Sequence, residues 1–238
     1  MNYDVLKVKE SNRMSSGKTD LTTKAYQEIR QTIFANDLKP GQKIPYRVMA
    51  KGLDMSLTPI IQALKHMEFM GLVKHTPNRG FVVKKATQKE IEEAFKLRIM
   101  IEPQLLSITM ENMDKIGEKK IKLALDAYLD APRSGNLKLR LIKDIHFHMT
   151  IAELSGQDLS ISFLRHLFDL LYLRSGQGMI LPRTFEDASE NHIAIYDAIK
   201  KRDTKTAIEQ LKMHLTHIYT NARDGINSGA EKNEQIVF

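Results

Sequence analysis

The hydrophobic pattern of the first third of the chain predicts three helices followed by two short strands. The expected elements are helices over residues 21–39, 47–53 and 56–70 and a hairpin over residues 72–85. Lys39-Pro40-Gly41 ends the first helix, Ser56 or Thr58 can cap the third, and Gly71 terminates it. Helices followed by a two-stranded ribbon are the pattern of a winged helix-turn-helix domain.

The third of these helices has two different faces. Ile60, Leu64 and Met67 share one face and are expected to pack on the domain core. The other face carries Leu57, Thr58, Ile61, Gln62 and Lys65. In a winged helix-turn-helix this outward face meets the major groove of DNA, so these residues are candidate base and phosphate contacts.

Beyond residue 86 the apolar spacing is helical throughout. A capping box, Thr87-Gln88-Lys89-Glu90, opens this region. Helices fit residues 88–113, 117–131, 136–155, 159–179, 185–201 and 204–222. No strand pattern follows residue 85, which predicts an all-α bundle. The expected fold is therefore mainly α: a tail over 1–20, a winged helix-turn-helix over 21–86, an all-helical domain over 87–224 and a tail over 225–238.

The basic residues in excess of acidic ones are concentrated in the N-terminal part of the chain. The chain has 36 Lys and Arg against 29 Asp and Glu, a net charge of +7. Residues 21–85 hold eleven basic and four acidic residues, which is 11 − 4 = +7, so the remainder is neutral. An excess confined to one block favours a polyanion such as double-stranded DNA as its partner, with a merely basic domain as the alternative.

Composition also limits the class of protein. The chain contains 0 cysteines, which excludes disulfides and thiolate metal sites. No apolar run approaches the ~18 residues of a membrane span, and the N-terminus lacks the apolar core of a signal peptide. We therefore expect a cytoplasmic protein with no membrane partner.

The segment KDIHFHMT holds one carboxylate and two histidines within a helix. Asp144 and His148 are four residues apart and share a face, whereas His146 is about 200° from either and points away. The surrounding residues are apolar, so a buried carboxylate and imidazole need partners. Asp144 and His148 alone can satisfy each other or a nearby arginine, which is a structural role without a metal.

Two further histidines strengthen the metal interpretation. His192 and His214 lie eleven residues before and eleven after Asp203, at the turn between the last two helices. In an antiparallel hairpin both are then about 16 Å from the turn, at the same level. His217 is one turn further along and matches less well. His192 and His214 can join Asp144 and His148 in a set of three nitrogens and one oxygen, which suits Zn(II) and other imidazole-binding divalent metals.

The N-terminal domain resembles the winged-helix domain of the GntR family of bacterial transcription factors. The resemblance rests on "LKPGQKIP", the helix start "S-x-TP", "GLV" and "RGFVV" at the spacing of the family. It implies operator contacts through Arg47, Ser56, Thr58, Arg79 and Gly80. Family members commonly carry S-R-T-P-x-R-x-A-L, where this chain has S-L-T-P-I-I-Q-A-L.

This departure replaces two expected arginines by Leu57 and Ile61. Arginine bound to guanine is worth roughly 1–3 kcal/mol of discrimination, so its loss predicts an altered or weaker operator preference. Leu57 and Ile61 can instead contact thymine methyl groups, which favours A·T-rich sites. Lys65, Arg47 and Arg79 remain for phosphates. The alternative is a winged module that no longer binds DNA by sequence.

Residues 90–222 resemble the ligand-binding domain of the FadR-like (FCD) subgroup. The matching motifs are "LR-x3-E" from Leu97-Arg98 to Glu102, "D-x3-H", "H-x2-I-x3-I" and a last histidine. The resemblance implies one divalent metal per chain, held by Asp144, His148, His192 and His214, with zinc favoured over nickel or manganese. It also implies a small organic acid held by the metal and Arg98; the complete ligand set argues against an acyl-CoA.

These features together predict a homodimeric bacterial transcription regulator, most simply a repressor relieved by its carboxylate effector. A metal-dependent enzyme would also use an open metal site beside an arginine. Catalysis needs a poised general base, and neither Glu153 nor Glu190 has the spacing for that role. Attachment to a DNA-binding domain favours sensing, with no catalytic residues.

Overall fold

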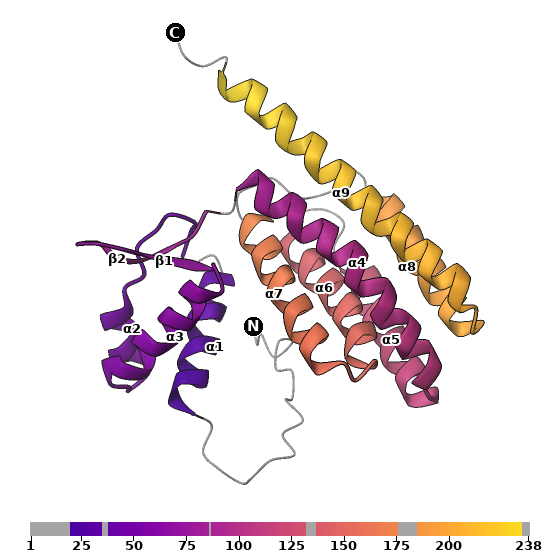
Figure 1. The fold of residues 1–238 in the computed structure, drawn as a ribbon, viewed down its shortest axis with the longest axis horizontal. Helices are drawn as coiled ribbons and strands as arrows, with labels where there is room; N and C mark the ends of the chain where they lie inside the picture. The colour runs from indigo at the N-terminus through magenta and orange to yellow at the C-terminus, as the bar shows by residue number, and fades with distance from the viewer. Residues whose placement is uncertain (1–19, 35–37, 86, 132–136, 176–184, 235–238) are drawn as a thin grey trace.

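The computed structural model describes residues 20–34, 38–85, 87–131, 137–175 and 185–234. The expected N-terminal tail and the breaks near residues 132–136 and Pro182 lie outside the described residues. The chain forms a winged domain followed by a helical bundle (Figure 1). The winged domain comprises α1 (Leu21–Phe34), α2 (Tyr46–Gly52), α3 (Leu57–Phe69), β1 (Val73–Thr76) and β2 (Gly80–Val83).

The wing is an antiparallel hairpin that is tied back to the segment before α2. Val73 pairs with Val83 in the register of the hairpin, and Ile44 N donates to Phe81 O at 2.8 Å. Asn78 has φ 61° and Gly80 has φ 80°. Positive φ is accessible to glycine and tolerated by asparagine, which explains the tight turn. The predicted winged helix-turn-helix is confirmed.

The second domain is the predicted bundle. Its helices are α4 (Gln88–Asn112), α5 (Lys115–Leu129), α6 (Leu137–Glu153), α7 (Asp158–Ser175), α8 (Phe185–Lys200) and α9 (Thr204–Glu234). Figure 1 shows α4 alongside α7 and α9, and α8 alongside α9. Within the described ranges no helix is long and apolar enough to cross a bilayer.

The ends of the bundle helices follow the expected chemistry with one difference. The predicted capping box is confirmed at the start of α4, where Thr87 Oγ1 accepts from Glu90 N and Glu90 accepts from Thr87 N. At the other end, α9 continues to Glu234, although we expected its helix to stop near residue 222. Gly225 and Gly229 cost only about 1 kcal/mol each in a helix and no proline follows, so nothing in this stretch forces an end.

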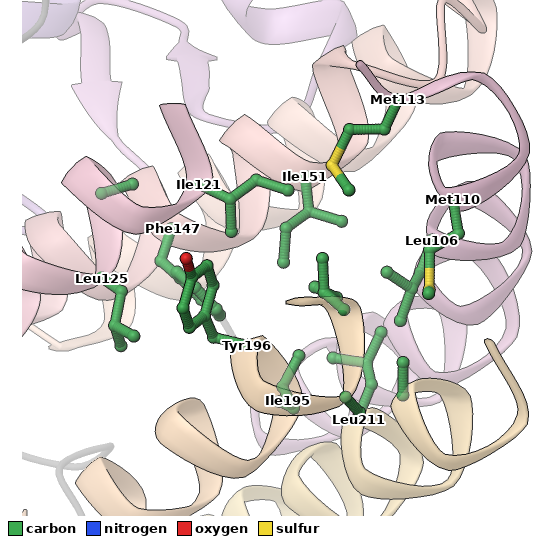
Figure 2. Close-up of a cluster of buried hydrophobic side chains, with 14 of the residues drawn as sticks. Leu106, Met110, Met113, Ile121, Leu125, Phe147, Ile151, Ile195, Tyr196 and Leu211 are labelled. Atoms are coloured by element: carbon green, nitrogen blue, oxygen red, sulfur yellow. The ribbon is translucent and has the colours of Figure 1, made fainter. Parts of the chain in front are cut away.

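Two apolar clusters fill the bundle. The first, shown in Figure 2, joins α4, α5, α6, α8 and α9 and includes Leu106, Phe147, Ile151, Ile195 and Leu211. The second joins α4, α6, α7 and α9 and includes Phe95 and Phe168. A fully buried phenylalanine contributes about 1.5–3 kcal/mol. Phe147 is next to His148 in the chain, so its burial helps to fix where that histidine lies.

Candidate metal centre and DNA-binding surface

Four polar side chains from three helices meet inside the bundle. Asp144 and His148 come from α6, His192 from α8 and His214 from α9. One ligand atom from each residue lies within 4.8 Å of the ligand atoms of the other three. The three imidazoles are buried, and the Asp144 side chain retains 14% exposure. The four residues selected from the sequence therefore converge on one point.

The distances within the cluster suit a single divalent ion. His192 Nε2 lies 3.0 Å from Asp144 Oδ1, His148 Nε2 lies 3.2 Å from His214 Nε2, and His148 Nε2 lies 3.9 Å from Asp144 Oδ1. Zinc–ligand bonds of about 2.0–2.2 Å place tetrahedral ligand atoms roughly 3.4 Å apart. The donor set therefore fits a zinc-sized cation without large rearrangement.

Two of the histidines are held with Nε2 facing the centre. His148 Nδ1 donates to Glu102 Oε2 at 2.7 Å, and His192 Nδ1 donates to Ala188 O at 2.6 Å. A hydrogen bond at Nδ1 fixes the tautomer and leaves the Nε2 lone pair for a metal. A carboxylate or carbonyl on the far side of the ring is the usual support of a metal-binding histidine.

The electrostatics of the cluster keep Asp144 ionised and His214 neutral. Burial, together with the nearby His192 and His148, holds the pKa of His214 well below its ordinary value. Burial alone would raise the pKa of Asp144, but the adjacent His192 and His148 hold it well below its usual range. Among the described residues His192 Nε2 has no hydrogen bond of good geometry. A cation placed between an ionised carboxylate and the imidazole nitrogens that face it stabilises such a cluster.

The depressed pKa of His214 makes the metal-free protein sensitive to acid. Unfolded histidine protonates near pH 6.5 whereas buried His214 stays neutral. The group therefore leaves the free energy of unfolding unchanged well above pH 6.5 and lowers it as the pH falls below 6.5, by at most about 1.4 kcal/mol per pH unit. As the pH falls below 6.5 we expect the free energy of unfolding of the wild type to decrease more steeply than that of His214→Asn. Urea unfolding with a chelator present measures this difference, and equal pH slopes would refute it.

Arg98 is linked to His148 through Glu102. Its Nε donates to Glu102 Oε1 at 2.5 Å, and both side chains are buried. Burial alone would raise the pKa of Glu102, but Arg98 and His148 lower it, so the carboxylate is charged. Among the described residues one terminal nitrogen of Arg98 has no hydrogen-bond partner. The sequence motif contained Glu102, but its contact with His148 was not predicted. Its position one helical turn after Arg98 could have indicated that it faces the same interior.

Arg140 is a second buried cation that sequence reasoning missed. It is one turn before Asp144 on α6, and its guanidinium lies 4.3 Å from the centre of the Tyr128 ring. It donates to Tyr128 Oη at 3.1 Å and to Ser189 Oγ at 2.6 Å. The Tyr128 ring in turn lies 4.3 Å from the His192 ring. The i, i+4 spacing from Asp144 could have indicated that Arg140 faces the same interior.

The histidines that the sequence set aside lie elsewhere. His146 and His217 are exposed. Neither belongs to the group of potential ligands among the described residues. The sequence argument from helical spacing therefore correctly excluded these two residues from the cluster.

The predicted DNA-binding side chains are wholly or partly exposed on α2, α3 and the wing tip. Ile60, Leu64 and Met67 of α3 are buried as expected. The exposed candidates from α2, α3 and the wing tip are Arg47, Ser56, Leu57, Thr58, Ile61, Lys65 and Arg79, with Gly80 partly exposed. Ser56 occupies the N-cap position of α3 without a side-chain hydrogen bond, so its hydroxyl is not used by the helix end. Leu57 and Ile61 are each 38% exposed.

The winged helix-turn-helix presents an exposed recognition helix, and the bundle joined to it buries a cluster of potential metal ligands. This combination is that of a DNA-binding transcription regulator. The chain belongs to the GntR family and carries an FCD domain. The family model of bacterial regulatory proteins of the gntR family matches residues 21–83, and that of the FCD domain matches residues 93–217. Proteins of this family bind operator DNA, typically as dimers, and are regulators rather than enzymes.

Similar proteins cover nearly the whole chain. An HTH-type transcriptional regulator of Bacillus subtilis, YdhC, is 23% identical over 207 residues, covering 87% of this chain and 92% of that protein. The HTH-type transcriptional repressor GlaR of Escherichia coli is 22% identical over 200 residues, covering 80% and 90%. The solved structure of E. coli McbR superposes with a TM-score of 0.75 at 18% identity, covering 87% of this chain and 99% of that one, which supports the fold.

Proposed function

We propose that this protein is a homodimeric repressor whose operator affinity falls when a small organic acid binds in the bundle. The acid would bind at one divalent metal held by Asp144, His148, His192 and His214. The observation that carries this proposal is the convergence of four ligand atoms within 4.8 Å, with the far sides of His148 and His192 already hydrogen-bonded. The relative named as a transcriptional repressor supports the sign of regulation.

The chemistry of the cluster supports zinc as the metal and a small carboxylic acid as the effector. Three imidazoles and one carboxylate suit zinc, with nickel and manganese as alternatives. When bound, such a metal supplies a coordination position that a carboxylate oxygen can take. The terminal nitrogen of Arg98 that has no hydrogen-bond partner among the described residues is a donor of the type that pairs with a carboxylate. Both features favour a small acid.

The same proposal assigns roles on the winged domain. Arg47, Lys65 and Arg79 are exposed cations placed to contact phosphates, which position the protein on DNA. Leu57 and Ile61 are exposed on α3 where an apolar side chain meets thymine methyl groups. We therefore propose an A·T-rich operator rather than the guanine-rich contacts that arginines would favour.

Replacing thymine by uracil in a selected operator tests this assignment, because it deletes only the methyl group. We expect Ile61→Ala to weaken binding to the thymine operator by about 1 kcal/mol and to reduce the difference between thymine and uracil, leaving the part that Leu57 contributes. Lys65→Gln, one turn along α3, should weaken both operators equally and lower the salt dependence by about one counterion. Binding isotherms at several salt concentrations report both effects. A wild type that does not discriminate thymine from uracil would contradict the methyl contacts.

The function as a whole is tested by metal analysis of the purified chain followed by a thermal-shift screen of organic acids. A stabilising acid should require the metal, and it should weaken binding to an operator selected from random duplex DNA. Operator affinity that does not change with the stabilising acid would refute the mechanism. Binding without preference among DNA sequences would instead identify the winged domain as an interaction module.

A further inference from the structure

Helix α7 contacts both the neighbourhood of the metal cluster and the winged domain through consecutive residues. Phe168 lies against the bundle interior: its ring centre is 4.3 Å from the Arg98 guanidinium and 6.0 Å from the His148 ring. Asp169 lies against α1, and its carboxylate binds Arg30 at both oxygens, at 2.5 and 2.9 Å. Consecutive helical residues differ in direction by about 100°, which allows α7 to contact both sides. We call the Arg30–Asp169 ion pair the interdomain bridge.

The interdomain bridge is well shielded and has good geometry. Asp169 retains 7% exposure and Arg30 retains 26%, and the two parallel hydrogen bonds are the bidentate form that gives arginine pairs their directionality. Leu170, the next residue, packs against the apolar core of the winged domain. Burial, and then the charge of Asp169, raise the pKa of Tyr26 on α1 to about 12, which keeps this phenol neutral beside the carboxylate. Helix α7 is also the bundle helix that faces α1 in Figure 1.

Helix α1 is in turn fixed to the recognition helix α3. Thr22 Oγ1 donates to Gln62 Oε1 at 2.9 Å, and the rings of Tyr26 and His66 lie 5.2 Å apart. Gln62 belongs to the outward face of α3 that is placed to meet DNA. These contacts connect α7, through α1, to the DNA-binding helix.

From these contacts we propose that the interdomain bridge transmits occupancy of the metal centre to the recognition helix. This inference rests on the proposed function, because it requires that the cluster be a metal site. Binding that orders His148 also orders Phe168, which lies against it. Phe168 and Asp169 share one helical turn, so the ordering reaches Arg30. Coupling of this kind needs a measured energetic link between the two sites, since proximity alone does not establish one.

The test uses Zn(II) as the probe and amide hydrogen exchange of the full-length protein as the readout. In the wild type, saturating Zn(II) should slow exchange in α1 and α3 by about tenfold, within the usual range of coupling between sites. Asp169→Asn and Arg30→Gln should each reduce this effect to less than about twofold, while Zn(II) still protects α6, α8 and α9 as in the wild type. Each variant breaks the same ion pair from a different domain, so the other still tests the inference if one of them folds poorly.

Arg165→Gln is the matched control on the same helix. Arg165 binds Glu153 of α6 at 2.9 Å in an exposed ion pair, so its partner belongs to the bundle rather than to the winged domain. Its removal should leave the Zn(II) effect on α1 intact. Zn(II)-dependent protection of α1 that persists in Asp169→Asn, or that is absent from the wild type, would overturn the inference. Calorimetric titration of Zn(II) is measured alongside: failure of the wild type to bind Zn(II) would refute the metal site itself and the bridge's role with it.

Discussion

Replacing His148 by alanine should abolish the stabilisation that Zn(II) gives to this protein. Binding at a hundred times the Kd stabilises a folded protein by about 2.7 kcal/mol, which corresponds to roughly 5–10 °C in Tm for a chain of this size. His148 is central to the cluster, with its Nε2 3.2 Å from His214 and 3.9 Å from Asp144. We expect Zn(II) affinity to fall by more than about 100-fold, beyond the loss typical of a supporting residue. Thermal unfolding with and without Zn(II) measures the effect.

His146→Ala is the matched control for this experiment. His146 lies two residues away on the same helix, is exposed, and is outside the group of potential ligands. Its replacement should leave the Zn(II)-dependent rise in Tm unchanged within error. If both variants lose the stabilisation equally, the metal is bound elsewhere or the helix has been disrupted, and the assignment of His148 as a ligand fails.

Replacing Glu102 by glutamine should damage both stability and metal binding. Glu102 accepts from Arg98 at 2.5 Å and from His148 at 2.7 Å inside the bundle. Removal of its charge leaves a buried guanidinium without its counter-ion, which costs about 3–5 kcal/mol in comparable pairs. Loss of the support behind a metal-binding histidine should also lower Zn(II) affinity by about 10–100-fold. Chemical unfolding without metal and calorimetric titration separate the two effects.

A second substitution distinguishes these causes. Arg98→Met in the Glu102→Gln background removes the uncompensated charge, so it should restore most of the stability without restoring Zn(II) affinity. Glu153→Gln removes a carboxylate from an exposed ion pair with Arg165 and should change stability by less than about 1 kcal/mol. A double variant that stays as unstable as Glu102→Gln would show that the cost is not electrostatic.

Much of the fold and of the candidate site could be predicted from local spacing. Period and end signals located the helices, and the i, i+4 rule placed Asp144 and His148 on one face of α6. His192 and His214 could be matched because a tight turn at Arg202-Asp203 makes α8 and α9 antiparallel neighbours of equal reach. In the structure their rings are 4.4 Å apart.

Contacts between helices distant in sequence could not be obtained in this way. Periodicity states which face of a helix is buried but not which helix covers it. The contact of Glu102 with His148 spans 46 residues, and that of Arg30 with Asp169 spans 139. Arg140 was missed because a charged residue on a helix is normally exposed, and its buried position depends on Tyr128 and Ser189 from two other helices.

The burial of the cluster determines how fast a bound metal ion can exchange. The side chains of His148 and His192 have 0% exposure and only Asp144 reaches solvent, at 14%. An ion surrounded by buried imidazoles exchanges only when the helices that carry them open locally, and such openings of a packed core are rare. The ion would therefore exchange slowly. A rapidly diffusing acid then sets the fast response of this regulator, whereas metal occupancy, which the interdomain bridge transmits, changes only on the slow timescale of these openings.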